Sequence, residues 1–196
     1  YDKAIEIGNE IFTHDEDKFT LANAYMLRGW AKVENRNYDG GIEDLKKANL
    51  IDPNNPFFKI GLLSIYLKDS KKDAFTENIN KIIEDLDSDS FFLDDKKLMN
   101  RFKSGLLYLR GTSIFDTEEK SYNNCIKDLT NSLDINNKNK EIDGINFINN
   151  EQIYMARGDC FLKTGDIKSA LNDYETALII SPSNPNIYNK LGYLKE

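Results

Sequence analysis

The chain has 196 residues, 40% of them hydrophobic, and a formal net charge of −7 at pH 7. This apolar content can bury a core, so we exclude a disordered tail and expect one elongated domain or two small ones. The negative charge argues against nucleic acid and anionic membranes as main partners, because both are bound through basic surfaces, and no apolar run approaches the ~20 residues that span a bilayer.

The N-terminal half is predicted to consist of helix pairs. Residues 1–12 have the spacing of the second helix of a preceding pair, and because the chain starts inside this pattern without Met, we expect it to be cut from a longer array. Residues 18–55 form a complete pair that ends near Pro53, since proline disfavours helical geometry in the residue before it. Residues 56–87 keep apolar residues at helical spacing but carry Leu63 where a small residue is expected, so they form a degenerate pair.

The C-terminal half is predicted to be less regular. Residues 88–139 form a pair with an extended first helix, from about Asp94 to Ile114, because apolar residues continue at helical spacing through this segment. Residues 140–184 begin with an Asn-rich insertion, which we expect to be a loop, and continue as a well-matched pair. Residues 185–196 have the pattern of the first helix of a further pair.

A 34-residue repeat underlies these pairs. Gly158 and Gly192 are separated by one such interval, and so are Tyr154 and Tyr188. When Gly29 is aligned with Gly158, five further positions agree: Tyr25, Arg28, Leu45, Ala48 and Pro53 match Tyr154, Arg157, Tyr174, Ala177 and Pro182. Small residues let two helices approach closely, so we expect Gly158 on one helix to face Ala170 and Ala177 on the next.

This pattern resembles the tetratricopeptide repeat (TPR), whose unit has large residues at positions 4 and 11, small ones at 8, 20 and 27, an aromatic or apolar residue at 24 and Pro at 32. Residues 151–184 satisfy all seven positions, whereas residues 22–55 depart at Lys32 and Gly41. The resemblance implies an all-α fold, a right-handed α-solenoid of stacked antiparallel helix pairs. It identifies 18–55 as a TPR repeat, 56–87 as a degenerate one, and the later segments as irregular and well-matched copies.

In this family the first helix of every pair lines a concave groove that binds a peptide or helix of a partner. The resemblance carries this role to nine candidate residues: Met26, Trp30, Ile60, Leu67, Tyr108, Thr112, Phe115, Met155 and Asp159. Aromatic residues and methionine are typical anchors of such interfaces. The alternative is that these side chains pack against the neighbouring repeat, and for Trp30 the two readings are equally supported.

One activity of the family is not expected here. Its chaperone-binding members hold a C-terminal carboxylate with Lys and Asn at positions 5 and 9 of one repeat and Asn at position 6 of the next. Met26, Trp30 and Gly61 occupy these positions. We therefore predict a protein or peptide partner, but no carboxylate-clamp chaperone tail.

The residues of the chain do not predict catalysis, a cofactor or a metal site. The single histidine, His14, lies in a polar connection, where a solvated side chain is the expected state. Cys125 and Cys160 are interpreted as buried free thiols that act as small hydrophobic residues. Two cysteines make no disulfide framework, which favours the cytoplasm or another intracellular aqueous compartment.

We expect a protein-protein interaction scaffold within a larger protein. The alternative is a structural spacer in a multi-subunit assembly that uses its convex face or its insertions for contacts. A catalytic role would require a domain outside this chain, and an RNA-reading helical repeat would require a basic groove, which the net charge disfavours.

Overall fold

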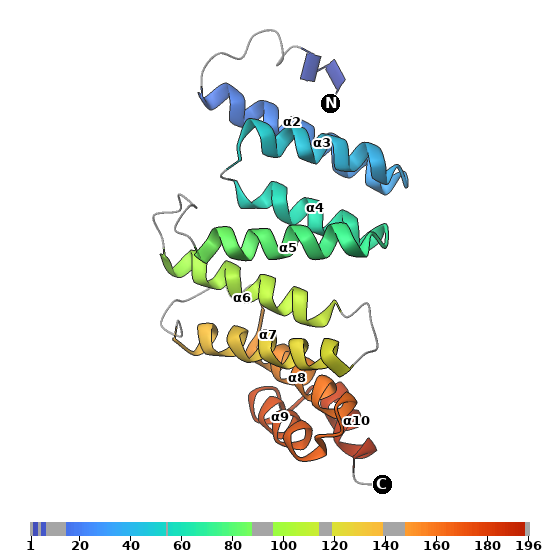
Figure 1. Cartoon of the computed structure of the whole chain (residues 1–196), viewed down its shortest axis with the longest axis vertical. Helices are drawn as coiled ribbons and strands as arrows, with labels where there is room; N and C mark the ends of the chain where they lie inside the picture. Colours follow the sequence, from blue (N-terminus) through green and yellow to red (C-terminus); the bar gives the residue numbers. More distant parts are fainter. Residues whose placement is uncertain are drawn as a thin grey trace. The chain divides into compact units, whose positions relative to one another are not determined.

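The computed structural model describes residues 2–3, 5–6, 15–53, 55–87, 96–113, 119–138 and 148–194. These residues form helices and short connections, and no strand occurs among them (Figure 1). The predicted all-α class is therefore confirmed. The chain divides into two compact units, unit 1 from Tyr1 to Phe92 and unit 2 from Leu93 to Glu196, each described separately below.

The described residues of unit 1 include four labelled helices, each packed on the next: α2 (Asp15–Glu34), α3 (Tyr38–Ile51), α4 (Pro56–Lys68) and α5 (Lys72–Asp87). Two asparagines start helices by accepting backbone hydrogen bonds. Asn37 Oδ1 accepts from the Gly40 amide at 3.0 Å, and Asn55 Oδ1 accepts from the Phe57 amide at 3.1 Å. These caps satisfy amide groups that have no partner within the helix.

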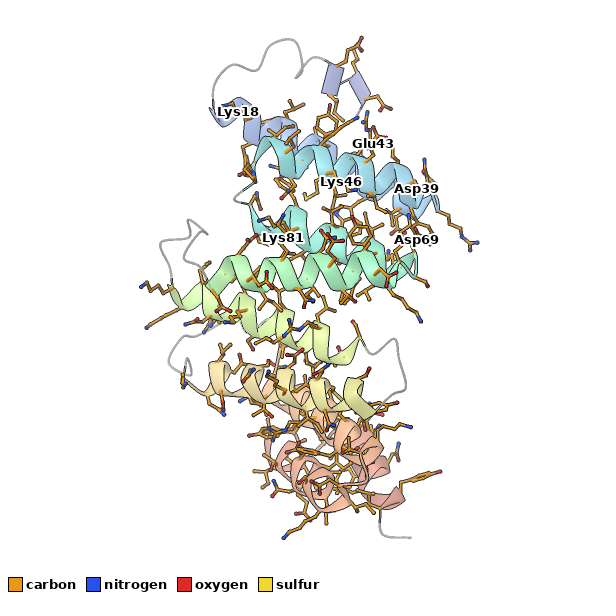
Figure 2. All side chains as sticks on the ribbon, viewed as in Figure 1. Lys18, Asp39, Glu43, Lys46, Asp69 and Lys81 are labelled. Atoms are coloured by element: carbon orange, nitrogen blue, oxygen red, sulfur yellow. A yellow bond between two sulfur atoms is a disulfide. The ribbon has the colours of Figure 1, made fainter. Side chains whose placement is uncertain are left out.

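The core of unit 1 is built from inward-facing apolar side chains of all four helices, with Leu45, Phe58 and Leu63 fully buried. Leu63 thus fills the core at the position where the sequence pattern expected a small residue. Most charged residues lie on the outside, with the buried Asp44 as an exception: Figure 2 labels several of the outer ones, and Glu43, Lys46 and Lys81 are exposed. The partition follows the helical period of the sequence.

The part of unit 2 that the structure describes forms five helices: α6 (Lys96–Thr112), α7 (Glu119–Lys138), α8 (Asn150–Lys163), α9 (Ile167–Ile180) and α10 (Pro185–Tyr193). Each helix from α6 to α9 packs on its successor in the chain. α6 lies within the predicted first helix, whose expected ends at Asp94 and Ile114 are outside the described residues, as is most of the predicted Asn-rich loop.

Tyr174, and not the predicted Ala170 or Ala177, makes the nearest contact with Gly158, although both alanines are buried in the same core cluster as Tyr174. A Cβ atom at Gly158 would lie 2.7 Å from Cε1 of Tyr174, so the flat tyrosine ring covers this glycine. The other repeats have the same arrangement, because Leu45 covers Gly29 and Leu129 covers Gly111. Helix pairs in both units therefore close by seating the large residue of the second helix over the small residue of the first.

Both departures of residues 22–55 from the repeat pattern have a structural reason. Lys32 stands where a large apolar residue is usual, and its Nζ lies 2.8 Å from Oδ2 of the buried Asp44. Gly41 stands where alanine is usual. A Cβ there would lie 2.5 Å from Cγ2 of Val33 and 3.0 Å from the carbonyl oxygen of Gly29, so this crossing of α2 and α3 has no room for a side chain.

An Arg–Asp pair recurs in three repeats and ties the first helix of each pair to the second. Three guanidinium groups each donate two hydrogen bonds to a buried carboxylate: Arg28 to Asp44, Arg110 to Asp128, and Arg157 to Asp173, with distances between 2.6 and 2.8 Å. Two parallel hydrogen bonds fix the geometry of both partners.

The two cysteines correct a prediction. Cys125 on α7 and Cys160 on α8 form a disulfide, with their Cα atoms 6.4 Å apart, so the interpretation as free thiols is wrong. Both are buried, as expected. The pairing arises because α7 and α8 pack side by side and bring together residues 35 positions apart. The irregular insertion between these helices hid that register in the sequence.

Candidate functional site

Two adjoining hollows open among the first helices of the pairs in unit 2. The larger has a volume of about 710 Å³ and is lined by α6, α8 and α10 together with Tyr122 of α7. The smaller, of about 410 Å³, is lined by the same three helices and by Asn184. Ala156 and Asp159 border both hollows, so we treat the two as one surface, the unit 2 groove.

Four of the nine predicted site residues border this groove. Tyr108 and Thr112 reach it from α6, and Met155 and Asp159 reach it from α8. The structure thus brings together the candidates that the sequence placed in two different repeats. Phe115 lies outside the described residues, as does His14.

Asp159 is held at the centre of the groove from two sides. The Tyr174 hydroxyl donates to Asp159 Oδ1 at 2.6 Å, and Lys190 Nζ donates to the same oxygen at 2.6 Å. Burial raises the pKa of Tyr174 above its ordinary value, and the hydrogen bond to the Asp159 carboxylate raises it further. Tyr174 therefore stays protonated and keeps donating, so Asp159 has a fixed orientation while its side chain remains 45% exposed.

The floor of the smaller hollow is polar, and hydrogen bonds to neighbouring residues hold its side chains in place. Glu151 accepts from the Ser181 hydroxyl at 2.9 Å and from the Asn184 side-chain amide, which joins the start of α8 to the connection before α10. Asn184 also accepts from the Asn186 backbone amide at 3.0 Å and so caps α10. Gln152 accepts from the Asn149 backbone amide at 3.4 Å. These contacts fix the backbone beneath the groove.

The charges around the groove balance. Two carboxylates, Glu151 and Asp159, stand with two lysines, Lys163 and Lys190. The remainder of the lining is mostly apolar in the larger hollow, with Ala156 and Leu162 among its residues, and amide-rich in the smaller one. This surface is suited to an uncharged ligand with apolar groups and a backbone that forms hydrogen bonds.

The predicted residues of unit 1 are arranged differently. Trp30 lies against α4: its Cζ2 atom is 3.5 Å from the position that a Cβ would take at Gly61, and Lys68 Nζ stands 5.9 Å from the centre of its ring. Met26 packs on the core cluster of this unit. Ile60 and Leu67 of α4 are half-buried. For Trp30, two alternatives were open: contact with a partner in the groove, or packing against the neighbouring repeat. The structure shows the packing contact.

The sequence analysis missed the contribution of α10. Asn186, Asn189 and Tyr193 border the groove and occupy positions 2, 5 and 9 of the repeat frame that starts at Pro185. The same frame gave the candidates in the earlier repeats. Applying it to the last twelve residues would have identified all three.

Other site types find no support in the described part of the chain. No group of three or more His, Cys, Asp or Glu residues there is arranged to hold a metal ion. No helix in the same residues is both long enough and apolar enough to cross a membrane.

Comparison with known proteins gives two matches to family models. One model, described as a TPR repeat, matches residues 150–196, and a second, described as a tetratricopeptide repeat, matches residues 22–55. The comparison with curated proteins gives no sequence match. The two matched segments contain Gly158 and Gly29, the residues that aligned the repeats.

Solved structures share the fold. A crystal structure of the MamA protein is 19% identical, with a TM-score of 0.63, and the match covers 88% of this chain and 80% of that one. A second MamA structure has a TM-score of 0.60 at 19% identity, covering 85% and 81%. A Pseudomonas aeruginosa pilF structure has a TM-score of 0.55 at 17% identity, covering 88% and 67%. These similarities confirm an all-α solenoid fold.

Proposed function

The chain belongs to the tetratricopeptide-repeat family, whose members serve in general as protein-interaction scaffolds, and from this premise we propose that the unit 2 groove binds a peptide or helix of a partner protein. The observation that carries the proposal is the pair of adjoining hollows bordered by α6, α8 and α10. Preformed walls reduce the ordering cost of binding, because the groove residues are already fixed by Tyr174, Lys190 and Glu151.

The two hollows suggest different roles for the ligand's parts. In the larger one, Leu162, Ala156 and the 88% exposed Tyr193 provide apolar surface for one or two bulky side chains. In the smaller one, Gln152 and Asn186 offer side-chain amides that donate to and accept from a peptide backbone. We therefore favour a weakly charged segment with an apolar anchor, and we propose Tyr108, Thr112, Met155 and Asp159 as contact residues.

A displayed library of random peptides, selected on the full chain, tests this proposal. Met155→Ala and Tyr193→Ala should each weaken the selected peptides about tenfold or more, because truncation of central anchors costs most in such interfaces. Binding should change little between about 0.05 and 0.5 M salt, since the charges of the lining balance. Selected peptides that bind both variants as tightly as the wild type would contradict groove binding.

The spacer alternative has one observation in its favour. Leu50 near the end of α3 and Ile179 near the end of α9 are both 82% exposed and occupy the same position, 29, of their repeats. Apolar residues repeated on an outer surface can form contacts in an assembly. Leu50→Ser and Ile179→Ser are therefore the matched controls. If the groove is the binding site, both variants should bind the selected peptides as the wild type does. If the outer surface is the binding site, both should lose partner binding.

A further inference from the structure

We infer that the Cys125–Cys160 disulfide is a permanent covalent lock, formed by oxidation during folding, that fixes α8 to α7 and so holds the central wall of the unit 2 groove. The inference concerns how the groove is built and does not depend on which ligand, if any, it binds. It rests on the position of the bond, on the connection that the bond bypasses, and on its burial.

The bond lies directly beneath the groove. Cys160 borders the larger hollow, one residue after Asp159. Its partner Cys125 lies in the apolar cluster formed with Leu129, Leu133 and Ile153. A movement of α8 relative to α7 would therefore displace groove residues and core residues together, and the disulfide opposes that movement.

The joint between α7 and α8 needs additional support because its connection is long. It runs from residue 139 to residue 149, whereas α3 and α4 are joined by residues 52–55, and α9 and α10 by residues 181–184. A longer connection restrains its two ends less. The described residues of the joint carry further ties: Arg157 donates to Thr130 Oγ1 at 3.0 Å and Asn136 donates to Asn150 Oδ1 at 3.0 Å.

Formation of the bond requires an oxidant of the disulfide class, such as oxidised glutathione. The thiolate of one cysteine attacks a glutathione sulfur and expels one glutathione thiolate, which leaves a mixed disulfide on the protein. The thiolate of the other cysteine then attacks the protein sulfur and expels the second glutathione. The protein loses two electrons and two protons, and these leave with two molecules of reduced glutathione.

The buried position makes the bond a lock and not a reversible switch. Cys125 is 1% exposed and Cys160 is 5% exposed, and reduction requires a thiolate to reach one of the two sulfur atoms. In the folded protein the low exposure of both residues hinders that approach, although Cys160 borders the larger hollow. The lock is thus suited to a compartment in which disulfides form and persist, which the cytoplasm, one of the compartments that the sequence favoured, generally is not.

Counting thiols tests whether the bond forms. The reduced, unfolded chain is refolded in a glutathione redox buffer, and its thiols are then titrated in denaturant. We expect no reactive thiol before reduction and two after it. Native protein treated with a mild thiol reductant should stay without reactive thiols for far longer than unfolded protein. Two reactive thiols after refolding, or equally fast reduction of the folded protein, would overturn the inference.

Hydrogen exchange tests whether the bond acts as a lock. We compare the oxidised full chain with the Cys125→Ala/Cys160→Ala variant. A second comparison uses wild type that was reduced in denaturant and refolded with reductant, so that the test does not depend on the variant folding correctly. Amides of α7 and α8 should exchange about tenfold faster or more without the bond. Amides of α2 to α5 should not change, since unit 1 contains no cysteine. Unchanged exchange in α7 and α8 in both comparisons refutes the lock.

Discussion

At the scale of single residues, buried carboxylates are the most demanding feature of the chain. Asp44 is fully buried and receives hydrogen bonds from Arg28, with Lys32 Nζ at 2.8 Å. Burial by itself would raise the pKa of Asp44, but these two cations outweigh it and hold the pKa below its ordinary value of 3.8. The Arg28 pKa is raised in turn, mainly by its hydrogen bond to Asp44. Asp44 is therefore ionised in the core, and each of its partners is needed.

Replacement of Arg28 by methionine should destabilise unit 1 by about 2–3 kcal/mol, because a hydrogen-bonded charge is lost beside a buried carboxylate that keeps only Lys32. Lys47→Met is the matched control, since Lys47 pairs with the exposed Glu43 one helical turn away. Pairs of that kind contribute at most about 0.5 kcal/mol. Urea unfolding followed by the fluorescence of Trp30, the single tryptophan, measures both variants. Equal midpoints for the two variants would contradict the assignment.

The pH dependence of Asp44 has a definite sign. Its pKa is lower in the folded state than in the unfolded state, so its contribution to stability is complete above pH 3.8 and is lost as the pH falls through the folded-state pKa. The stability difference between wild type and Asp44→Asn should therefore be largest near neutral pH and shrink progressively below about pH 4. Urea midpoints at a series of pH values measure this difference. A difference that stays constant down to pH 3 is the contrary result.

At the scale of elements, three helix pairs close through a small residue under a large one, at Gly29, Gly111 and Gly158. Tyr174 covers Gly158 with ring atoms as near as 2.7 Å to a Cβ position, whereas no atom of the residues that the structure describes lies within 4 Å of such a position at Gly192. Gly192 occupies the equivalent place on α10, the last described helix. The two glycines thus share a repeat position but not an environment.

This contrast gives opposite expectations for the same substitution. Gly158→Ala should destabilise the protein by about 1–3 kcal/mol, because Tyr174 is fully buried and bonded to Asp159 and has no room to move. Gly192→Ala should be neutral or stabilise by at most about 1 kcal/mol, since Gly192 lies in the last turn of α10 and alanine has the higher helix propensity. Chemical unfolding followed by far-UV circular dichroism compares them. A Gly158→Ala protein as stable as wild type would exclude the close contact.

The sequence predicted the helix pairs well and their side-chain partners less well. The 34-residue spacing of Gly158 and Gly192 reflects the length of one helix pair and is visible directly in the sequence. Which residue covers Gly158 depends on side-chain direction, and the pairing of Cys125 with Cys160 depends on the length of an irregular insertion. Neither the residue that covers Gly158 nor the cysteine pairing can be predicted from the periodicity of a local stretch of sequence. The contact of Trp30, a residue of α2, with α4 likewise depends on how the two helices pack, which no local period encodes.

At the scale of the whole molecule, the two units have the same repeat architecture but different means of stabilisation. Unit 1 has short connections between its second and third helices and contains no cysteine. Unit 2 has a long connection, a disulfide and a groove bordered by three of its helices. A disulfide that closes a loop of 35 residues contributes about 3–4 kcal/mol. The unit with the groove is thus also the unit with the covalent restraint.

Hydrogen exchange of the full chain with and without a saturating selected peptide tests the groove most directly. Our account predicts that the peptide slows exchange in α6, α8 and α10, the helices that border the unit 2 groove, and leaves the ends of α3 and α9 unchanged. Slower exchange at Leu50 and Ile179 with no change in α8 would contradict it.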